Sequence, residues 1–304
     1  ELDLSQNSHV DGTIPTTVSL LRDLKVLVLS GMKLSGSIPS QIGEMKSLER
    51  LILSSNRLSH LPSEIGNLEN LKDLWCDNNK LQGKIPVELG KCTNLCSLIM
   101  GGNSFSGQIP IEIGLLTHLT SLKMSFNVGF DKTPVPLPLL KQLLNLTRLE
   151  LSTINLSSSI PTDIALLKQL RHLDLSANNL VGAIPSELGL CKDLKVLQLN
   201  QNSLTGQIPM EMVNLTELTR FDLLSNQLKG PMPSEIGMMT NLESFLFGQN
   251  FFSGMIPTEV CSLWDYSLKM FGTPHAIAAG SSSSFLSLYG NAQCPDFECC
   301  PECA

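Results

Sequence analysis

Residues 202–209 read Asn202-Ser203-Leu204-Thr205-Gly206-Gln207-Ile208-Pro209. They are part of a longer pattern, Leu-x-x-Leu-x-Leu-x-x-Asn-x-Leu-x-Gly-x-Ile-Pro-x-x-Leu-Gly, which recurs eleven times. Its Asn position falls at Asn7, Met32, Asn56, Asn79, Asn103, Asn127, Ile154, Asn178, Asn202, Asn226 and Asn250, at spacings of 23 to 27 residues. A period of this size predicts a solenoid, in which each coil buries its apolar face only against neighbouring coils.

Each coil is expected to contain one short strand. Leu173 and Leu175 alternate with Asp174, which is the period-2 pattern of a strand with one buried face. Asn178 follows where the chain must turn inward, and a buried amide there must find hydrogen-bond partners. We therefore predict a ladder of stacked Asn side chains, with the strands pairing in parallel on the inner side of a bent stack.

The second half of a coil should turn and form a short helical piece. Gly182 permits a backbone conformation that other residues resist, and Pro185 ends strand pairing because it lacks an N–H. The stretch 186–189 then predicts one helical turn with Ser186 as its cap.

Several repeats depart from the pattern. Met32 and Ile154 replace the ladder Asn, and the unit at 58–62 is one residue short and loses its Gly. The unit from Asn127 to Ile154 is three residues longer than the others and carries Pro134, Pro136 and Pro138. The long unit is either a bulged connection on the outside of the coil or a protruding contact loop.

The regular period covers residues 1–260, and residues 261–304 follow a different pattern. Leu286 to Asn291 repeats the Leu-x-Leu-x-x-Asn core 41 residues after Asn250, so we interpret it as a degenerate twelfth repeat. The rest of this segment is expected to form a Cys-rich C-terminal cap.

Nine cysteines fall into two groups. Cys76, Cys92 and Cys191 occupy apolar positions of the repeat and are expected to be small core residues, whereas Cys96 lies just ahead of a strand. The late cluster comprises Cys261, Cys294, Cys299, Cys300 and Cys303. It predicts a disulfide-stapled cap in an oxidising compartment, with zinc binding at the CxxC of residues 300–303 as the competing interpretation.

Composition argues against two kinds of partner. A net charge of −7 with 16% charged residues does not favour nucleic-acid binding, because proteins bind the phosphates of nucleic acids with a basic surface. The sequence contains no run of 18 or more apolar residues, so it predicts no membrane span.

The sequence shows no signal peptide and begins inside a strand at residues 1–4, so we expect a fragment or a chain whose N-terminal capping unit was removed.

The Asn-x-Leu-x-Gly-x-Ile-Pro stretch resembles the plant-type subclass of leucine-rich repeats, found in receptor-like kinases, receptor-like proteins and polygalacturonase-inhibiting proteins. The resemblance covers residues 1 to about 260. It implies a right-handed solenoid with a concave parallel sheet, 3₁₀ helices on the convex side and often a second short sheet. The tail at 294–303 is denser in cysteine and looks more like leucine-rich repeat proteins of diatoms and related algae.

In this family ligands meet the concave sheet through the outward positions of the strands. The candidate ligand-binding residues are Arg50, Asp73, Trp75, Asp77, Lys123, Phe126, Arg148, Glu150, His172, Asp174, Gln198, Arg220 and Asp222. We interpret Trp75 and Phe126 as exposed aromatic anchors for a peptide or a glycan.

The charged candidates have alternative interpretations. Arg148, Glu150, His172 and Asp174 would form a charged patch, or would only pair with one another across strands. Asp174 and Asp222 occupy a position where the repeat commonly carries Asp between two apolar residues, so these two aspartates need not contact a ligand.

Three sequons occur, at Asn145, Asn155 and Asn214, a number that chance could also give. They are compatible with a secreted glycoprotein or the ectodomain of a cell-surface protein.

The leading hypothesis is a non-catalytic extracellular recognition module, either a receptor-like ectodomain or a secreted inhibitor, without cofactor or metal. Its partners would be a peptide, a protein or a polysaccharide, and a co-receptor. The alternative is a structural or adhesive wall-associated protein, with ice binding disfavoured because the outward positions vary. The chain holds no HExxH, phosphate-binding Gly loop or nucleophile elbow, so we expect no enzyme.

Overall fold

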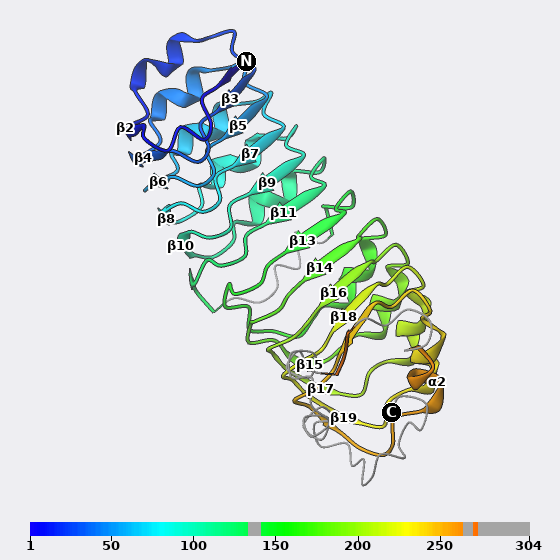
Figure 1. The fold of residues 1–304 in the computed structure, drawn as a ribbon. Coiled ribbons are helices and arrows are strands. Elements are labelled where there is room, and N and C mark those ends of the chain that lie inside the picture. The colour runs from blue at the N-terminus through cyan, green and yellow to red at the C-terminus, as the bar shows by residue number, and fades with distance from the viewer. Residues whose placement is uncertain (133–140, 264–269, 273–304) are drawn as a thin grey trace. The chain divides into compact units, whose positions relative to one another are not determined.

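The computed structural model describes residues 1–132, 141–263 and, as backbone, 270–272 (Figure 1). The chain forms two compact units, Glu1–Asn155 (unit 1) and Leu156–Ala304 (unit 2). The border falls at the end of the long repeat, and the three prolines of that repeat lie outside the described residues.

Unit 1 is a solenoid built on one parallel sheet. Among its described residues the strand order is β1 (Leu2–Asp3), β3 (Val26–Val28), β5 (Arg50–Ile52), β7 (Asp73–Trp75), β9 (Ser97–Ile99), β11 (Ser121–Lys123) and β13 (Arg148–Glu150). Leu27, Leu51, Leu74, Leu98 and Leu122 stand in register at the middle of successive strands, and all are buried. The parallel sheet and the buried leucine of each coil agree with the predicted repeat.

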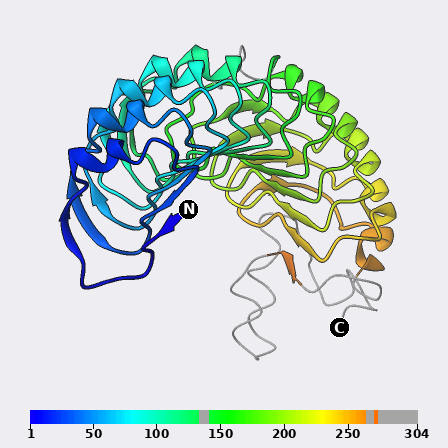
Figure 2. The same ribbon diagram turned by 90° about the horizontal axis from the view of Figure 1, so that it is seen from above.

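Short 3₁₀ helices lie on the outer side of unit 1, opposite the sheet (Figure 2). They are η1 (Thr16–Leu20), η2 (Ser40–Glu44), η3 (Ser63–Asn67), η4 (Val87–Lys91) and η5 (Ile111–Leu115). Two small sheets lie between strand and helix: β2 (Asp11–Thr13), β4 (Lys33–Gly36) and β6 (Arg57–Leu58), then β8 (Gln82–Gly83), β10 (Ser104–Gly107) and β12 (Gly129–Phe130). The gap between β6 and β8 falls at the repeat that is one residue short.

Unit 2 repeats the same design. Its main sheet holds β14 (His172–Asp174), β16 (Val196–Gln198), β18 (Arg220–Asp222), β20 (Ser244–Leu246) and β22 (Met270–Gly272). Its second sheet holds β15 (Val181–Ala183), β17 (Ser203–Gly206), β19 (Gln227–Gly230) and β21 (Phe251–Phe252). On its outer side lie η6 (Thr162–Leu166), η7 (Ser186–Leu190), η8 (Met210–Asn214), η9 (Ser234–Met238) and the short helix α2 (Thr258–Cys261).

The strand next to β20 is β22, with Ser244 in register with Met270. Leu286 to Asn291, where the twelfth repeat was expected, lies outside the described residues, as do Cys294, Cys299, Cys300 and Cys303. Cys261 is buried at the end of α2 and is disulfide-bonded.

The predicted Ser cap of the helical turn is wrong. Pro185 occupies the cap position of η7, no side chain caps the helix, and the Ser186 hydroxyl instead donates to the Glu187 carboxylate at 3.3 Å. Every 3₁₀ helix of the described residues follows a proline in the same way, because proline fixes φ and has no N–H to leave unpaired.

Glycines in the helical turns allow close packing of coils. A Cβ on Gly90 would lie 2.6 Å from the carbonyl oxygen of Glu112 in the next coil. Gly182, as the sequence suggested, has a positive φ of 79°.

The Asn ladder is the main polar element inside the coils. Asn103 is buried, and its Nδ2 donates to the carbonyls of Cys76 and Met100, both at 3.0 Å. Its Oδ1 accepts from the N–H of Leu81 at 3.0 Å. One amide therefore joins its own coil to the preceding coil, and the same pattern recurs at Asn56 and Asn226.

In the two repeats without a ladder Asn, other groups form hydrogen bonds with the backbone. Met32 is buried, and the N–H of Val10, which an Asn would have served, donates to the Asn7 carbonyl at 2.9 Å. Ile154 is buried too, and the Nδ2 of the adjacent Asn155 donates to the Phe130 carbonyl of the preceding coil at 3.1 Å.

Replacing a ladder Asn should destabilise the fold far more than replacing a surface Asn. Asn103→Ala leaves the Leu81 N–H without its acceptor and removes one of two amide donors from each of the Cys76 and Met100 carbonyls, so we expect a loss of about 1–3 kcal/mol. Asn94→Ala removes one exposed hydrogen bond to the Glu69 carbonyl and should cost below about 1 kcal/mol. Urea unfolding of both variants measures the difference, and equal losses would contradict the role assigned to the ladder.

Candidate functional site

The inner face of unit 1 presents two rows of side chains, from the first and third residues of each strand. The first-position row is Val26, Arg50, Asp73, Ser97, Ser121 and Arg148, and the third-position row is Asp3, Val28, Ile52, Trp75, Ile99, Lys123 and Glu150. Strand pairing places neighbours within a row about 4.8 Å apart.

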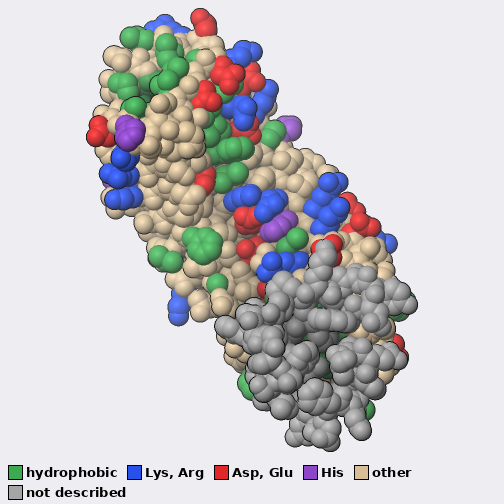
Figure 3. Space-filling model, in the orientation of Figure 1, with side chains coloured by type: hydrophobic (Ala, Val, Ile, Leu, Met, Phe, Trp, Pro, Cys, Tyr) green, Lys and Arg blue, Asp and Glu red, His purple; other side chains and the backbone are tan. Residues whose placement is uncertain are grey.

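Four consecutive members of the third-position row are apolar. We call Val28, Ile52, Trp75 and Ile99 the apolar stripe. Figure 3 shows hydrophobic side chains gathered over these strands, beside acidic and basic groups. Sequence reasoning missed the three aliphatic members because it searched for charged and aromatic residues, although the third position of each strand would have identified them.

Trp75 lies at the centre of the apolar stripe but is not the fully exposed aromatic that was expected. Its indole is half-buried, and Nε1 donates to the Ser97 hydroxyl of β9 at 3.0 Å. The hydrogen bond directs the ring toward the next strand. Val28, Trp75 and Ile99 are half-buried and form the accessible part of the apolar stripe, whereas Ile52 is 6% exposed.

Acidic residues flank Trp75 on the same face of β7. Asp73 forms an ion pair with Arg50, with Oδ2 and Nε 3.0 Å apart. Asp77 accepts hydrogen bonds from the Ser54 hydroxyl at 2.5 Å and from Asn78 Nδ2 at 2.7 Å. Within residues 1–132 and 141–263, no Lys or Arg pairs with Asp77.

Charged residues bound the apolar stripe at β11 and β13. Glu150 pairs with Arg148 on its own strand and with Lys123 Nζ at 3.6 Å on the neighbouring strand. These three candidate residues therefore form one network within unit 1.

Unit 2 carries the other candidates on the inner face of its sheet. His172 and Arg220 stand in the first-position row, and Asp174, Gln198 and Asp222 share the third-position row. Asp174 Oδ1 accepts from the backbone N–H of Ser176, two residues on, at 2.9 Å. That contact gives the Leu-Asp-Leu aspartate a local structural role.

Asp222 departs from the expectation of an outward, accessible side chain. It is 3% exposed, accepts from the Leu224 N–H at 3.2 Å and pairs with Arg220 at 3.4 Å. Burial raises the pKa of this carboxyl, against the lowering effect of these two partners. A group this buried supports the strand end and offers no ligand contact.

Phe126 was expected in an outward strand position, and the structure places it elsewhere. It lies three residues beyond Lys123, the last residue of β11, with φ of 60° and 64% exposure. The matching positions of the other described coils also have positive φ. Gly31, Asn78 and Gly102 suit it, smaller side chains such as Ser55 and Ala177 adopt it too, and Phe126 is the bulkiest residue there. Phe126 is therefore a strained, exposed aromatic outside the apolar stripe.

Relieving this strain should stabilise unit 1. Phe126→Asn keeps the N–H that donates to the Ser152 carbonyl and suits positive φ, so we expect a gain of about 0.5–1 kcal/mol in unfolding free energy. The matched control is Val128→Asn, at an exposed residue without positive φ, which should change stability by less than about 0.5 kcal/mol. Thermal denaturation measures both, and a destabilised Phe126→Asn would contradict the assignment of strain.

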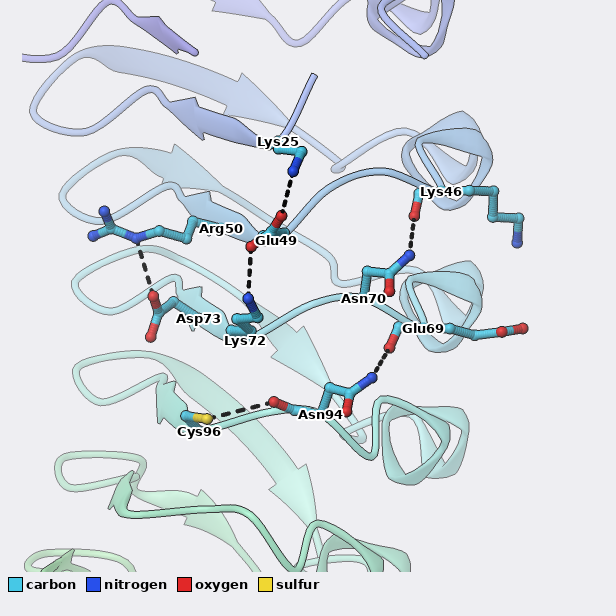
Figure 4. Close-up of polar contacts among 10 residues, drawn as sticks. All are labelled: Lys25, Lys46, Glu49, Arg50, Glu69, Asn70, Lys72, Asp73, Asn94 and Cys96. Atoms are coloured by element: carbon cyan, nitrogen blue, oxygen red, sulfur yellow. Dashed lines mark hydrogen bonds and ion pairs between the residues drawn. The ribbon is translucent and has the colours of Figure 1, made fainter. Parts of the chain in front are cut away.

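An ion network borders the inner sheet just ahead of the strands (Figure 4). Glu49 pairs with Lys25 Nζ at 3.1 Å and with Lys72 Nζ at 2.7 Å, from the two neighbouring coils. The hydrogen bond from Lys72, followed by the one from Lys25, lowers the pKa of the Glu49 carboxyl. In the same region, Asn70 and Asn94 each donate to a carbonyl of the preceding coil.

The lowered pKa of Glu49 makes part of the stability pH-dependent. The folded state binds the Glu49 proton more weakly than the unfolded chain, so this stabilisation is present at neutral pH and is lost as pH falls through the lowered pKa. Glu49→Gln should therefore be less stable than wild type at pH 7 and should approach it near pH 3. Urea unfolding midpoints measured across this pH range test the prediction. The control is Glu69→Gln, because the Glu69 carboxylate forms no ion pair within the described residues. Parallel curves of midpoint against pH for wild type and Glu49→Gln would contradict the prediction.

The remaining candidates are placed as follows. Asn145 is exposed and donates to the Thr117 carbonyl at 2.9 Å, Asn155 is half-buried, and Asn214 is exposed at the end of η8. Glycosylation at all three stays a prediction. Cys76, Cys92 and Cys191 are buried free thiols, as expected of core residues, and burial raises the pKa of Cys92 and Cys191 to about 11.

In the part of the chain that the structure describes, no three His, Cys, Asp or Glu side chains are grouped to hold a metal ion. None of the helices described there is long and apolar enough to cross a bilayer.

The chain belongs to the leucine-rich repeat family. The family described as "Leucine-rich repeat region" matches residues 1–163, and the "Leucine Rich Repeat" family matches residues 169–191. These matches confirm the resemblance seen in the sequence. A comparison with curated proteins found no match.

Three solved structures illustrate what the chain is similar to. The plant peptide hormone receptor RGFR1 in complex with RGF2 is 35% identical with a TM-score of 0.79, over 82% of this chain and 40% of the receptor. The PEPR1-AtPEP1 structure is 34% identical with a TM-score of 0.75, over 88% of this chain and 40% of the other. A plant ice-binding protein is 25% identical with a TM-score of 0.69, over 82% of this chain and 81% of the other. The chain spans 40% of the length of each of the first two of these structures.

Proposed function

We propose that this chain is a non-catalytic recognition module that binds an extended peptide across the inner sheet of unit 1. The observation that carries the proposal is the apolar stripe, Val28, Ile52, Trp75 and Ile99, in register on four neighbouring strands. A sheet face that only needed solvation would carry polar side chains in this row, as an alternating strand usually does.

The dimensions of the apolar stripe suit a short extended segment. Three strand spacings of about 4.8 Å give a length of about 14 Å, which four or five extended residues would cover. Fully burying one aliphatic side chain contributes about 1.5–3 kcal/mol, so two or three such contacts give about 3–9 kcal/mol before the cost of association. Micromolar binding requires about 8 kcal/mol net, so contacts outside the apolar stripe must contribute as well. Trp75 supplies the large, rigid surface that is typical of binding hot spots.

The similarity to RGFR1, which is a peptide hormone receptor, supports a peptide over a glycan as ligand. By the same analogy we propose that the module is extracellular, as part of a receptor. The secreted inhibitor and a co-receptor stay proposals from the sequence resemblance.

Substitution of the apolar stripe should abolish peptide binding. The probe is a fluorescein-labelled pentapeptide library with Leu or Phe fixed at the central position, read by fluorescence anisotropy. Trp75→Ala combined with Ile99→Ser should weaken binding by about tenfold or more, because the ligand loses its apolar contacts.

The control removes the same kind of surface from the opposite side of unit 1. Val87 and Ile111 are 50% and 65% exposed on the outer helices η4 and η5, and Val87→Ser with Ile111→Ser should leave binding unchanged. Circular dichroism verifies the fold of both variants. Equal anisotropy for all three proteins would overturn the proposal.

Ice binding is the second candidate, because the plant ice-binding structure matches this chain over most of both lengths. The third-position row of unit 1 speaks against it, since it changes from aliphatic to aromatic to charged residues and offers no regular array. Thermal hysteresis of the purified protein distinguishes the two, and a hysteresis unaffected by Trp75→Ala with Ile99→Ser would favour ice binding elsewhere on the surface.

A further inference from the structure

We infer that Asp77 makes the apolar stripe selective for peptides that carry a basic side chain beside an apolar one. The inference rests on the proposed function, since it names the ligand chemistry of the same face. It starts from Asp73 and Trp75 on the inner side of β7 and from Asp77, two residues further on, where main-chain pairing with the neighbouring coils continues.

The two aspartates differ in their partners. The Asp73 carboxylate lies 3.0 Å from the Arg50 guanidinium, so its charge is already balanced within the protein. Asp77 accepts only from neutral groups, the Ser54 hydroxyl and the Asn78 amide, among the residues that the structure describes. It is half-buried, so its negative charge is less screened than that of a fully exposed carboxylate.

Neutral donors also hold the Asp77 carboxylate in place. Ser54 lies on the coil before it and Asn78 follows it in the chain, and each binds a different oxygen. On the side of the next coil, the Asn78 N–H pairs with the carbonyl of Gly101, a residue without a side chain. The anion is therefore fixed in orientation and is not covered by a side chain from residue 101.

Distance connects Asp77 to the apolar stripe. Two residues along an extended chain span about 6.6 Å, which separates the Trp75 and Asp77 side chains on one face. A Lys or Arg reaches this far from a backbone that lies over the apolar stripe, with its aliphatic stem against Trp75 and its charge at Asp77. An acidic side chain in the same place would be repelled by the negative charge of Asp77, which no cation of the described residues balances.

The experiment uses three pentapeptide sets that are identical except for one position, which holds Lys, Gln or Glu, each labelled with fluorescein. Wild-type protein should bind the Lys set about fivefold more tightly than the Gln set and the Glu set most weakly, and 0.5 M NaCl should reduce the difference. Asp77→Asn keeps a side chain that can hydrogen-bond to Ser54 and should bind all three sets alike. Asp77→Lys should reverse the order.

The matched control is Asp131→Asn, an exposed aspartate of unit 1 beyond β12, which should keep the wild-type order. Equal affinity of wild type for the three sets, or an order that persists in Asp77→Asn, would overturn the role of Asp77 and leave the peptide-binding module intact. Failure of wild type to bind any set would overturn the proposed function together with this inference.

Discussion

Each coil of this protein depends on one amide placed where the strand ends and the chain turns inward. The Asn103 side chain donates to carbonyls of two coils and accepts from a backbone N–H, so it satisfies backbone groups that no strand or helix reaches. Burying such groups unpaired would cost a few kcal/mol in every coil. The ladder thus lets the chain turn through its own interior, and the inner sheet and the outer helices are arranged around it.

The exceptions indicate what the ladder must supply. At Ile154 the amide moves one residue along, to Asn155, and still reaches the preceding coil. At Met32 the Asn7 carbonyl takes over the N–H of Val10. The Phe130 carbonyl that Asn155 reaches is not a group that a ladder Asn serves. What the two coils share is a backbone N–H, of Val10 and of Phe130, that donates to the carbonyl of the Asn three residues before it, at 2.9 and 3.4 Å. The requirement for this N–H is therefore an acceptor and not a particular side chain.

The fold could be predicted almost completely from the sequence, because a 24-residue period constrains each coil through its neighbours. The strand at His172–Asp174 and the positive φ of Gly182 followed from residue pattern alone. The site was harder to predict, because side-chain accessibility depends on neighbouring coils. Asp222 occupies an outward position and is nevertheless buried, and Phe126 lies beyond the strand in which it was expected. Local hydrogen bonding within the Leu-Asp-Leu motif is not visible in the spacing of residues.

In the three-residue strands of the inner sheet of unit 1, the middle residue packs in the core and the two flanking residues face the inner surface. In β9, Leu98 is buried and contributes to the core, whereas Ser97 and Ile99 on either side face the inner surface of unit 1. The middle position is constrained by packing with the neighbouring coils, whereas most flanking positions are more accessible, with buried exceptions such as Ile52 in unit 1 and Asp222 in unit 2. Ligand preference can therefore change one coil at a time, by single substitutions that leave folding almost untouched, and adding a coil would lengthen the recognition surface by a fixed increment.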